Sequence, residues 1–309
     1  MNYKIIVPIV AVIAILAVVT APEYKGVKLK IVPIDGGNGP VTPTDETVRN
    51  GLYPLSRPLF IYVNNASLRR PEVKAFVSFY MTNAEQLVAE VGYTPFDPSV
   101  YQDNLQKLNG LVTLTQQLSG TIEIDGSSTV FPITQAVAEK FMKEYPNMRV
   151  IVGVSGTGGG FKRFVRGEIE INDASRPISY SEALAATQNG VQYIEFKVAI
   201  DGLAVVVHSS NTWVDYLTVQ ELNMTWRPGS TVYRWSDIRK NWPDEPIHLY
   251  GPGTDSGTFD YFTEVVVGTA KASRPDYTAS EDDNVLVQGV LRDPYALGYF
   301  GYAYYKQHE

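Results

Sequence analysis

The sequence repeats one local pattern three times: a β-strand, then a short loop rich in serine, threonine and glycine, then the first turn of a helix. The three loops span residues 127–129, 155–160 and 255–258. Strands that alternate with helices in this way predict parallel β-sheets covered by helices, which is an α/β fold. Loops that follow parallel strands collect at one edge of a sheet, so we expect the three loops to meet there.

These loops have the chemistry of an anion-binding site. A helix N-terminus carries unpaired N–H groups and a partial positive charge, and hydroxyl groups add further donors. Glycine lets the backbone approach a ligand closely. Any one of these loops is explained equally well as an ordinary helix cap. Three of them in one chain favour a shared anion site.

The sequence DASRP suggests a cation for this site. Arg176 follows a turn-like stretch rather than lying on a helix surface. Its guanidinium group can hold two oxygens of a tetrahedral anion at once. The alternative is an exposed arginine or a structural ion pair. Lys162 and Arg163 follow the second loop, and we expect Arg163 to lie outside the pocket.

A carboxylate beside the site would select an anion that carries a proton. Monohydrogen phosphate can donate that proton to the carboxylate, whereas sulfate at neutral pH cannot and would be repelled. We favour Asp201, because Asp201 and Gly202 interrupt an apolar strand in which a lone aspartate is costly. The other candidates are Asp125, Asp173 and Asp255. Of these, Asp255 could equally cap its own loop.

The known catalytic signatures are incomplete. Residues 255–258 match the short motif of aspartic proteases, but the second copy that such enzymes need is absent. The sequence has no Gly-x-Ser-x-Gly motif, and Lys162 is not followed by Ser or Thr as in a nucleotide-binding loop. It also has no cysteine and three histidines. We therefore predict a binding protein and not an enzyme, with no cofactor and no metal site.

The N-terminal residues 5–19 are almost wholly apolar and follow Lys4. The run is shorter than the ~20 residues of a membrane span and favours a secretory signal peptide. Pro22 disfavours cleavage after residue 21, so residues 1–21 are either a signal peptide or a retained membrane anchor. In both cases we expect an extracytoplasmic protein, periplasmic or at the cell surface. The net charge of −7 argues against a nucleic-acid partner.

Seven stretches carry a resemblance to a known family. They are IDGSSTVFPIT, VSGTGGGFKRF, DASRPIS, YGPGTDSGTFDYF, TASEDDNVLVQGV, ALGYFGYAYY and YPLSRPLFIYV. In these stretches, which are spread over residues 28–309, the sequence resembles the periplasmic phosphate-binding proteins of phosphate ABC transporters. The order differs from the family, because the family's C-terminal part, here residues 27–108, comes first. The sequence therefore resembles a circularly permuted member, with residues 109–120 as the new linker.

The resemblance implies a type II periplasmic-binding-protein fold, in which two α/β lobes are joined by hinge strands and phosphate lies in the cleft. One lobe would be continuous over residues 54–207, and the other would be split into residues 22–53 and 208–309. The chain would cross between the lobes near residues 56–60 and 203–207.

The resemblance also implies a set of phosphate contacts: Ser128, Thr129, Val130, Thr157, Ser256, Gly257 and Thr258. Some relatives add an arginine before the third loop and an aspartate in the DASRP stretch, where this chain has Pro252 and Ser175. Arg176 is then the expected cation. Asp201 is the expected proton acceptor, although the departure leaves its identity open.

These observations predict high-affinity binding of inorganic phosphate by a monomer that delivers phosphate to an ABC permease in the membrane. Two alternatives stay open. The protein could bind another tetrahedral oxyanion, such as sulfate or molybdate. It could also be a membrane-anchored extracellular phosphate sensor or scaffold.

Overall fold

The computed structural model describes residues 28–108, 118–254, 256–280 and 282–306. The signal peptide or anchor predicted over residues 1–21 lies outside the described residues, as does most of the linker predicted at residues 109–120. In the described ranges, every helix is too short or too polar to cross a membrane.

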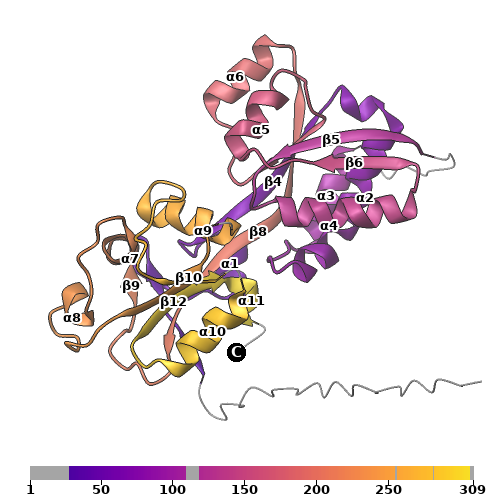
Figure 1. Ribbon diagram of the computed structural model, residues 1–309. Helices are drawn as coiled ribbons and strands as arrows, with labels where there is room; N and C mark the ends of the chain where they lie inside the picture. Colours follow the sequence, from indigo (N-terminus) through magenta and orange to yellow (C-terminus); the bar gives the residue numbers. More distant parts are fainter. Residues whose placement is uncertain (1–27, 109–117, 255, 281, 307–309) are drawn as a thin grey trace, which may run out of the picture.

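A nine-stranded sheet runs through the whole molecule (Figure 1). Its strand order is β11-β10-β12-β8-β4-β7-β5-β6, and β1 pairs with β8. The strands are β1 (Leu29–Ile31), β4 (Ser56–Asn64), β5 (Gly120–Gly126), β6 (Met148–Val152), β7 (Ile171–Ala174), β8 (Tyr193–His208), β10 (His248–Pro252), β11 (Thr278–Ser280) and β12 (Ala296–Gly301). A smaller sheet contains β2 (Ile34–Asp35), β3 (Pro40–Val41) and β9 (Leu217–Thr218).

Helices cover the sheet in two groups, which form the two lobes seen in Figure 1. The upper lobe contains η1 (Ser67–Arg69), α2 (Pro71–Glu90), α3 (Pro98–Lys107), α4 (Phe131–Glu144), α5 (Thr157–Phe164) and α6 (Tyr180–Gln188). The lower lobe contains α1 (Asp45–Arg49), α7 (Val219–Trp226), α8 (Trp235–Ile238), α9 (Gly257–Phe262), the π-helical turn η2 (Thr263–Val267), α10 (Asp283–Arg292) and α11 (Tyr302–Lys306).

Strands β4 and β8 connect the lobes. They pair antiparallel from Ser56 opposite Gly202 to Asn64 opposite Tyr193, with one register shift beside Leu59. The predicted interruption at Asp201 and Gly202 is wrong, because β8 continues to His208 by pairing with β12 and β1. The apolar run in β8 is therefore one long strand buried between helices.

Each lobe has its own hydrophobic core, and the cores locate the crossing points. Leu55 and Ile200 belong to the core of the lower lobe, whereas Leu59 and Ala199 belong to that of the upper lobe. The first crossing thus falls within the predicted residues 56–60. The second lies at residues 199–200 and not at the predicted 203–207, because residues 203–207 already pair with β12 inside the lower lobe.

The local sequence explains several helix starts. Thr44 caps α1 and accepts a hydrogen bond from the Thr47 backbone N–H at 3.1 Å, while the Thr47 hydroxyl accepts from the Thr44 N–H at 2.8 Å. Threonine thus does here what glutamate usually does in a capping box. Helix α5 begins at Thr157, so residues 157–160 of the predicted second loop are helical. A Cβ on Gly160 would lie 1.9 Å from Asn172 Oδ1, so the glycines let this helix pack against the sheet.

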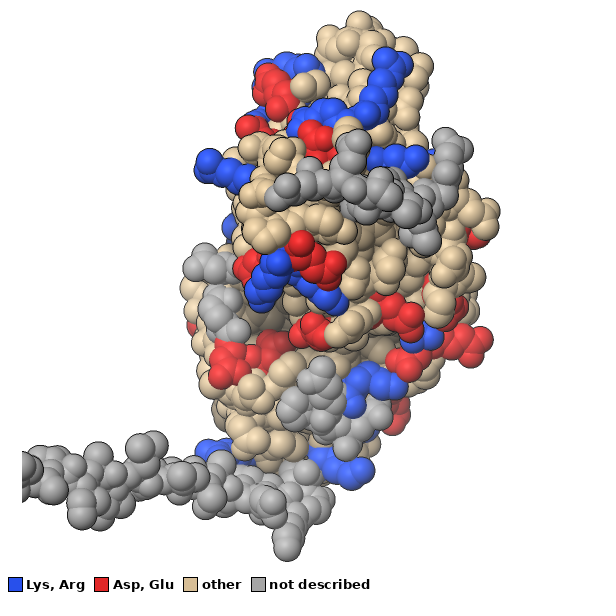
Figure 2. All heavy atoms as spheres, turned by 90° about the vertical axis from the view of Figure 1, so that its right-hand side faces the viewer, with Lys and Arg blue, Asp and Glu red and all other residues tan. Residues whose placement is uncertain are grey.

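On the face shown in Figure 2, lysine and arginine side chains lie among aspartate and glutamate side chains, so neither sign of charge dominates this face.

Candidate functional site

The predicted loops follow the ends of parallel strands, as expected. The first loop joins β5 to α4 and the second joins β6 to α5, while β7 lies on the other side of β5. Gly126 has a φ of +142°, and a Cβ there would lie 2.1 Å from the Asp173 carbonyl oxygen. This close approach lets the Ser127 N–H donate to the Asp173 carbonyl at 2.9 Å. Glycine at position 126 therefore holds the first loop against the end of β7.

The third loop, between β10 and α9, meets the first loop from the opposite lobe. The Thr129 hydroxyl lies 3.5 Å from the Gly257 carbonyl oxygen, and the Ser128 hydroxyl donates to Asp260 Oδ2 at 3.0 Å. A Cβ on Gly257 would lie 2.9 Å from the Thr129 Cα, so a larger residue would push the loops apart. This contact divides the cleft into two cavities.

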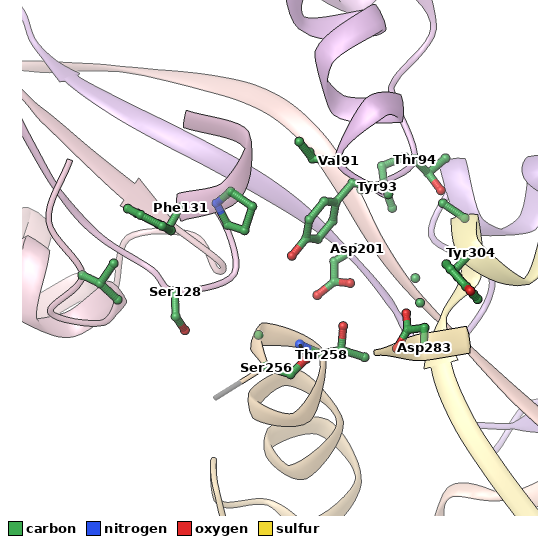
Figure 3. Close-up of a pocket in the computed structure, with 18 residues that line it drawn as sticks. Val91, Tyr93, Thr94, Ser128, Phe131, Asp201, Ser256, Thr258, Asp283 and Tyr304 are labelled. Carbon is green, nitrogen blue, oxygen red and sulfur yellow. Dashed lines mark hydrogen bonds between the residues drawn. The ribbon is translucent and has the colours of Figure 1, made fainter. Parts of the chain in front are cut away.

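The larger cavity has a volume of about 540 Å³ and is shown in Figure 3. Asp201 projects into it from β8 and lies between Tyr93 and Thr258 in the figure. Asp283 also lines this cavity, and no lysine or arginine does so among the described residues. The larger cavity is therefore acidic and suits an anion poorly.

The smaller cavity has a volume of about 340 Å³ and lies where the first two loops face the lower lobe. Its positive charge comes from Arg57, Arg176 and Lys271, and its negative charge from Asp260 and Glu264. Its hydroxyl-bearing residues are Ser127, Ser128, Thr129, Thr157 and Ser175. The smaller cavity thus combines cations with hydrogen-bond donors.

The structure distributes the predicted contact residues between these cavities. Thr129, Thr157 and Arg176 line the smaller one, and Ser128 lines both. The larger cavity is lined by Asp201, Ser256, Gly257 and Thr258. Val130 lines neither cavity, because it is the N-cap residue of α4 and its side chain is fully buried in the core of the upper lobe.

Arg57 is the partly buried cation that the sequence analysis missed. It lies on β4 directly opposite Asp201 of β8, with its Nε 3.5 Å from Asp201 Oδ2. The guanidinium group stacks on the Tyr261 ring at 3.8 Å, and Nη2 donates to the Thr129 hydroxyl at 3.3 Å. The sequence did contain a signal for Arg57. Burying an arginine at the start of an apolar strand costs desolvation free energy, just as burying Asp201 does.

Asp201 is held in an unusual electrostatic state. Burial raises its pKa, and the neighbouring Arg57 lowers it, with a net rise from 3.8 to about 6. Its Oδ2 is buried and accepts no hydrogen bond from the described residues. Asp201 and Arg57 therefore form an ion pair without a hydrogen bond between Oδ2 and Nε, at the point where the chain crosses between the lobes.

Arg176 lines the smaller cavity but is already paired. Its Nη1 and Nη2 donate to the two carboxylate oxygens of Glu182 at 2.9 Å each, and its guanidinium lies 5.5 Å from the Phe161 ring. Burial raises the pKa of Glu182, but hydrogen bonds from Arg176 and Ser179 outweigh it and leave that pKa below its ordinary value. In the structure Arg176 thus makes the ion pair that was the alternative to a free cation.

The remaining candidate aspartates have other roles. Asp125 binds Arg163 at 2.7 Å, which keeps Arg163 away from the cavities as expected. Asp173 is fully buried beneath the first loop and accepts from the Thr134 hydroxyl at 3.0 Å. Burial raises the pKa of Asp173 to about 8. Asp255 lies outside the described residues. In the described part of the chain, His, Asp and Glu side chains form no group of three that could hold a metal ion.

Known proteins resemble this chain in sequence. Protein SphX of Synechocystis sp. is 51% identical over 192 residues, which are 62% of this chain and 57% of that protein. The phosphate-binding protein PstS of Staphylococcus saprophyticus is 39% identical over 192 residues, which are 62% of this chain and 58% of that protein. The aligned part therefore spans less than two thirds of the length of these relatives.

The structure has a close counterpart. The crystal structure of a possible phosphate-binding protein from Planctomyces limnophilus DSM 3776 aligns with a TM-score of 0.60 and 57% sequence identity, covering 62% of this chain and 67% of that chain. The circularly permuted order stays a prediction. A family profile described as a PBP superfamily domain matches residues 10–84 and 112–309. With its two α/β lobes joined by hinge strands, this chain belongs to the PBP superfamily.

Proposed function

We propose that this protein binds inorganic phosphate in the cleft between its lobes and passes it to an ABC permease. The observation that carries the proposal is the smaller cavity, in which the first two loops face the partly buried guanidinium of Arg57. Relatives such as PstS of Staphylococcus saprophyticus, named a phosphate-binding protein, support the choice of ligand.

Electrostatics favours the smaller cavity over the larger. A phosphate dianion loses much hydration on burial, so it needs a cation and several donors in return. Arg57, Lys271 and the N-terminus of α5, whose first residue is Thr157, can supply them. The larger cavity would instead oppose the anion with Asp201 and Asp283. In this proposal Asp201 orients Arg57 and does not itself accept the proton of phosphate.

The two lobes would close on the anion by bending at β4 and β8. The first loop and α9 meet across the cleft, through Ser128 to Asp260 and Thr129 to Gly257, so contacts between the lobes can stabilise the closed, bound state. We propose the predicted lobes, residues 54–207 for one and 22–53 with 208–309 for the other, with one change: residues 200–207 go to the second lobe, because they pack in its core. A monomeric, extracytoplasmic protein would suit delivery to a permease.

Calorimetric titration tests this function. The tryptophans at 213, 226, 235 and 242 line neither cavity, which makes calorimetry a better choice than intrinsic fluorescence. We expect saturable 1:1 binding of phosphate and much weaker binding of sulfate and molybdate. Replacing Arg57 by methionine should weaken phosphate binding strongly. Phosphate that fails to bind, or binds equally well without Arg57, would refute this assignment of the site.

A further inference from the structure

Arg57 has two carboxylate partners of different character. Its Nε faces Asp201, whose side chain is 3% exposed, and its Nη1 donates to Glu264 Oε2 at 2.9 Å. The Glu264 side chain is 48% exposed. The first carboxylate is therefore fixed inside the protein, whereas the second can move into solvent at little cost.

Glu264 and the proposed anion need the same edge of Arg57. The Tyr261 ring covers one face of the guanidinium, Asp201 lies at Nε, and the Thr129 hydroxyl lies at Nη2. Nη1 is the remaining nitrogen, and it donates to Glu264, which also lines the smaller cavity. An anion that reaches Nη1 must displace this carboxylate or share the space with its negative charge.

We propose that Glu264 is a built-in competitor that lowers the affinity of the cleft for anions by holding Arg57. This inference rests on the proposed function and adds a residue that sets affinity. A flexible carboxylate gives Arg57 a second negative partner beside Asp201, so that Nη1 also has an acceptor before the anion binds. Phosphate then binds only by replacing one negative partner with another.

The other cavity arginine shows why Glu264 and not Glu182 has this role. Glu182 is the third residue of α6, and it accepts hydrogen bonds from the Ser179 N–H and the Ser179 hydroxyl as well as from Arg176. Moving Glu182 would break the cap of its helix. In the described part of the chain, the Glu264 carboxylate is hydrogen-bonded to Arg57 alone. Glu264 therefore leaves its partner more easily.

The test is calorimetric titration of the wild type, Glu264→Gln and a matched control with phosphate and, separately, with sulfate. Glu168→Gln is the control, because its carboxylate is 44% exposed and paired with Arg166 at 2.8 Å but lines neither cavity. We expect Glu264→Gln to bind phosphate about 5- to 30-fold more tightly and to bind sulfate more tightly by a similar factor. Glu168→Gln should bind both anions like the wild type.

Each other outcome has a distinct meaning. An unchanged affinity in Glu264→Gln overturns the proposal, and so does a weaker one. A loss of phosphate binding with a gain in sulfate binding also overturns it, because Glu264 would then be accepting the proton of phosphate. An equal gain in Glu168→Gln would show a general charge effect and would overturn the specific competition. A wild type that binds no phosphate refutes the proposed function itself, which separates the two failures.

Discussion

Replacing Asp173 by asparagine should make the protein less sensitive to rising pH. Asp173 is fully buried beneath the first loop, where its Oδ1 accepts from Thr134 and its Oδ2 has no hydrogen-bond partner among the described residues. Burial raises its pKa from 3.8 to about 8, and the nearby Asp125 adds to the rise. The folded state thus favours the neutral acid, which asparagine imitates in size and charge.

The sign and size of the effect follow from linkage. Between pH 3.8 and about 8 the folded protein keeps a proton that the unfolded chain releases, so the stability contributed by Asp173 falls as the pH rises through this window. At ~1.4 kcal/mol per pKa unit, the cost grows from roughly 1.5 kcal/mol at pH 5 to roughly 5 kcal/mol at pH 8. The wild type should therefore lose up to about 4 kcal/mol relative to Asp173→Asn between these two pH values.

Urea unfolding at pH 5 and pH 8 measures this quantity. The difference between wild type and Asp173→Asn is taken at each pH, and the change in that difference isolates Asp173 from every other titrating group. Asp103→Asn is the control, because Asp103 is exposed. A change below about 0.5 kcal/mol, or one equal to that of the control, would refute the claim that burial keeps Asp173 protonated.

Other predictions concern the cleft and the loops. Arg57→Met should weaken phosphate binding by about 2–5 kcal/mol in calorimetry. Arg176→Ala should cost less than about 1 kcal/mol, because the Arg176 side chain is more exposed than that of Arg57 and its partner Glu182 is fixed by the cap of α6. The reverse order would identify Arg176 as the anion's cation. Gly160→Ala should lower stability in urea by at least about 1–3 kcal/mol, since its Cβ would meet Asn172 Oδ1 at 1.9 Å. Gly158→Ala should not lower stability, because the nearest atom to its Cβ would be 3.8 Å away. Equal stabilities of the two variants would contradict the packing of α5.

The sequence predicted the parts of the site that depend on local chemistry. A strand followed by hydroxyl residues, glycine and a helix start is visible in any short window, and all three loops border the cleft. Capping is equally local, as the Thr44 and Thr47 pair shows. The conformation of the glycine run, residues 158–160, is harder to predict from sequence, because both a loop and a closely packed helix favour glycine. Only the contact of Gly160 with Asn172 decides between them.

The parts that failed depend on register between distant strands. Arg57 and Asp201 are neighbours only because β4 and β8 pair at those positions, which no window of sequence shows. The sequence supplied Asp201 without its partner Arg57, and it supplied Arg176 without showing that Glu182 pairs with it. The division of the contact residues into two cavities likewise follows from the approach of Thr129 to Gly257, which is a property of the folded chain.

The pairing of β4 with β8 has a mechanical consequence. Their ladder runs from Tyr193 to Gly202, past the level at which one core gives way to the other, with a single register shift beside Leu59. A change in the angle between the lobes must therefore bend or twist two hydrogen-bonded strands. Such a paired ribbon resists deformation more than a flexible linker would. We therefore expect the lobes to move over a narrow range of angles relative to each other. Because β4 and β8 are hydrogen-bonded strands, they should resist cleavage by proteases.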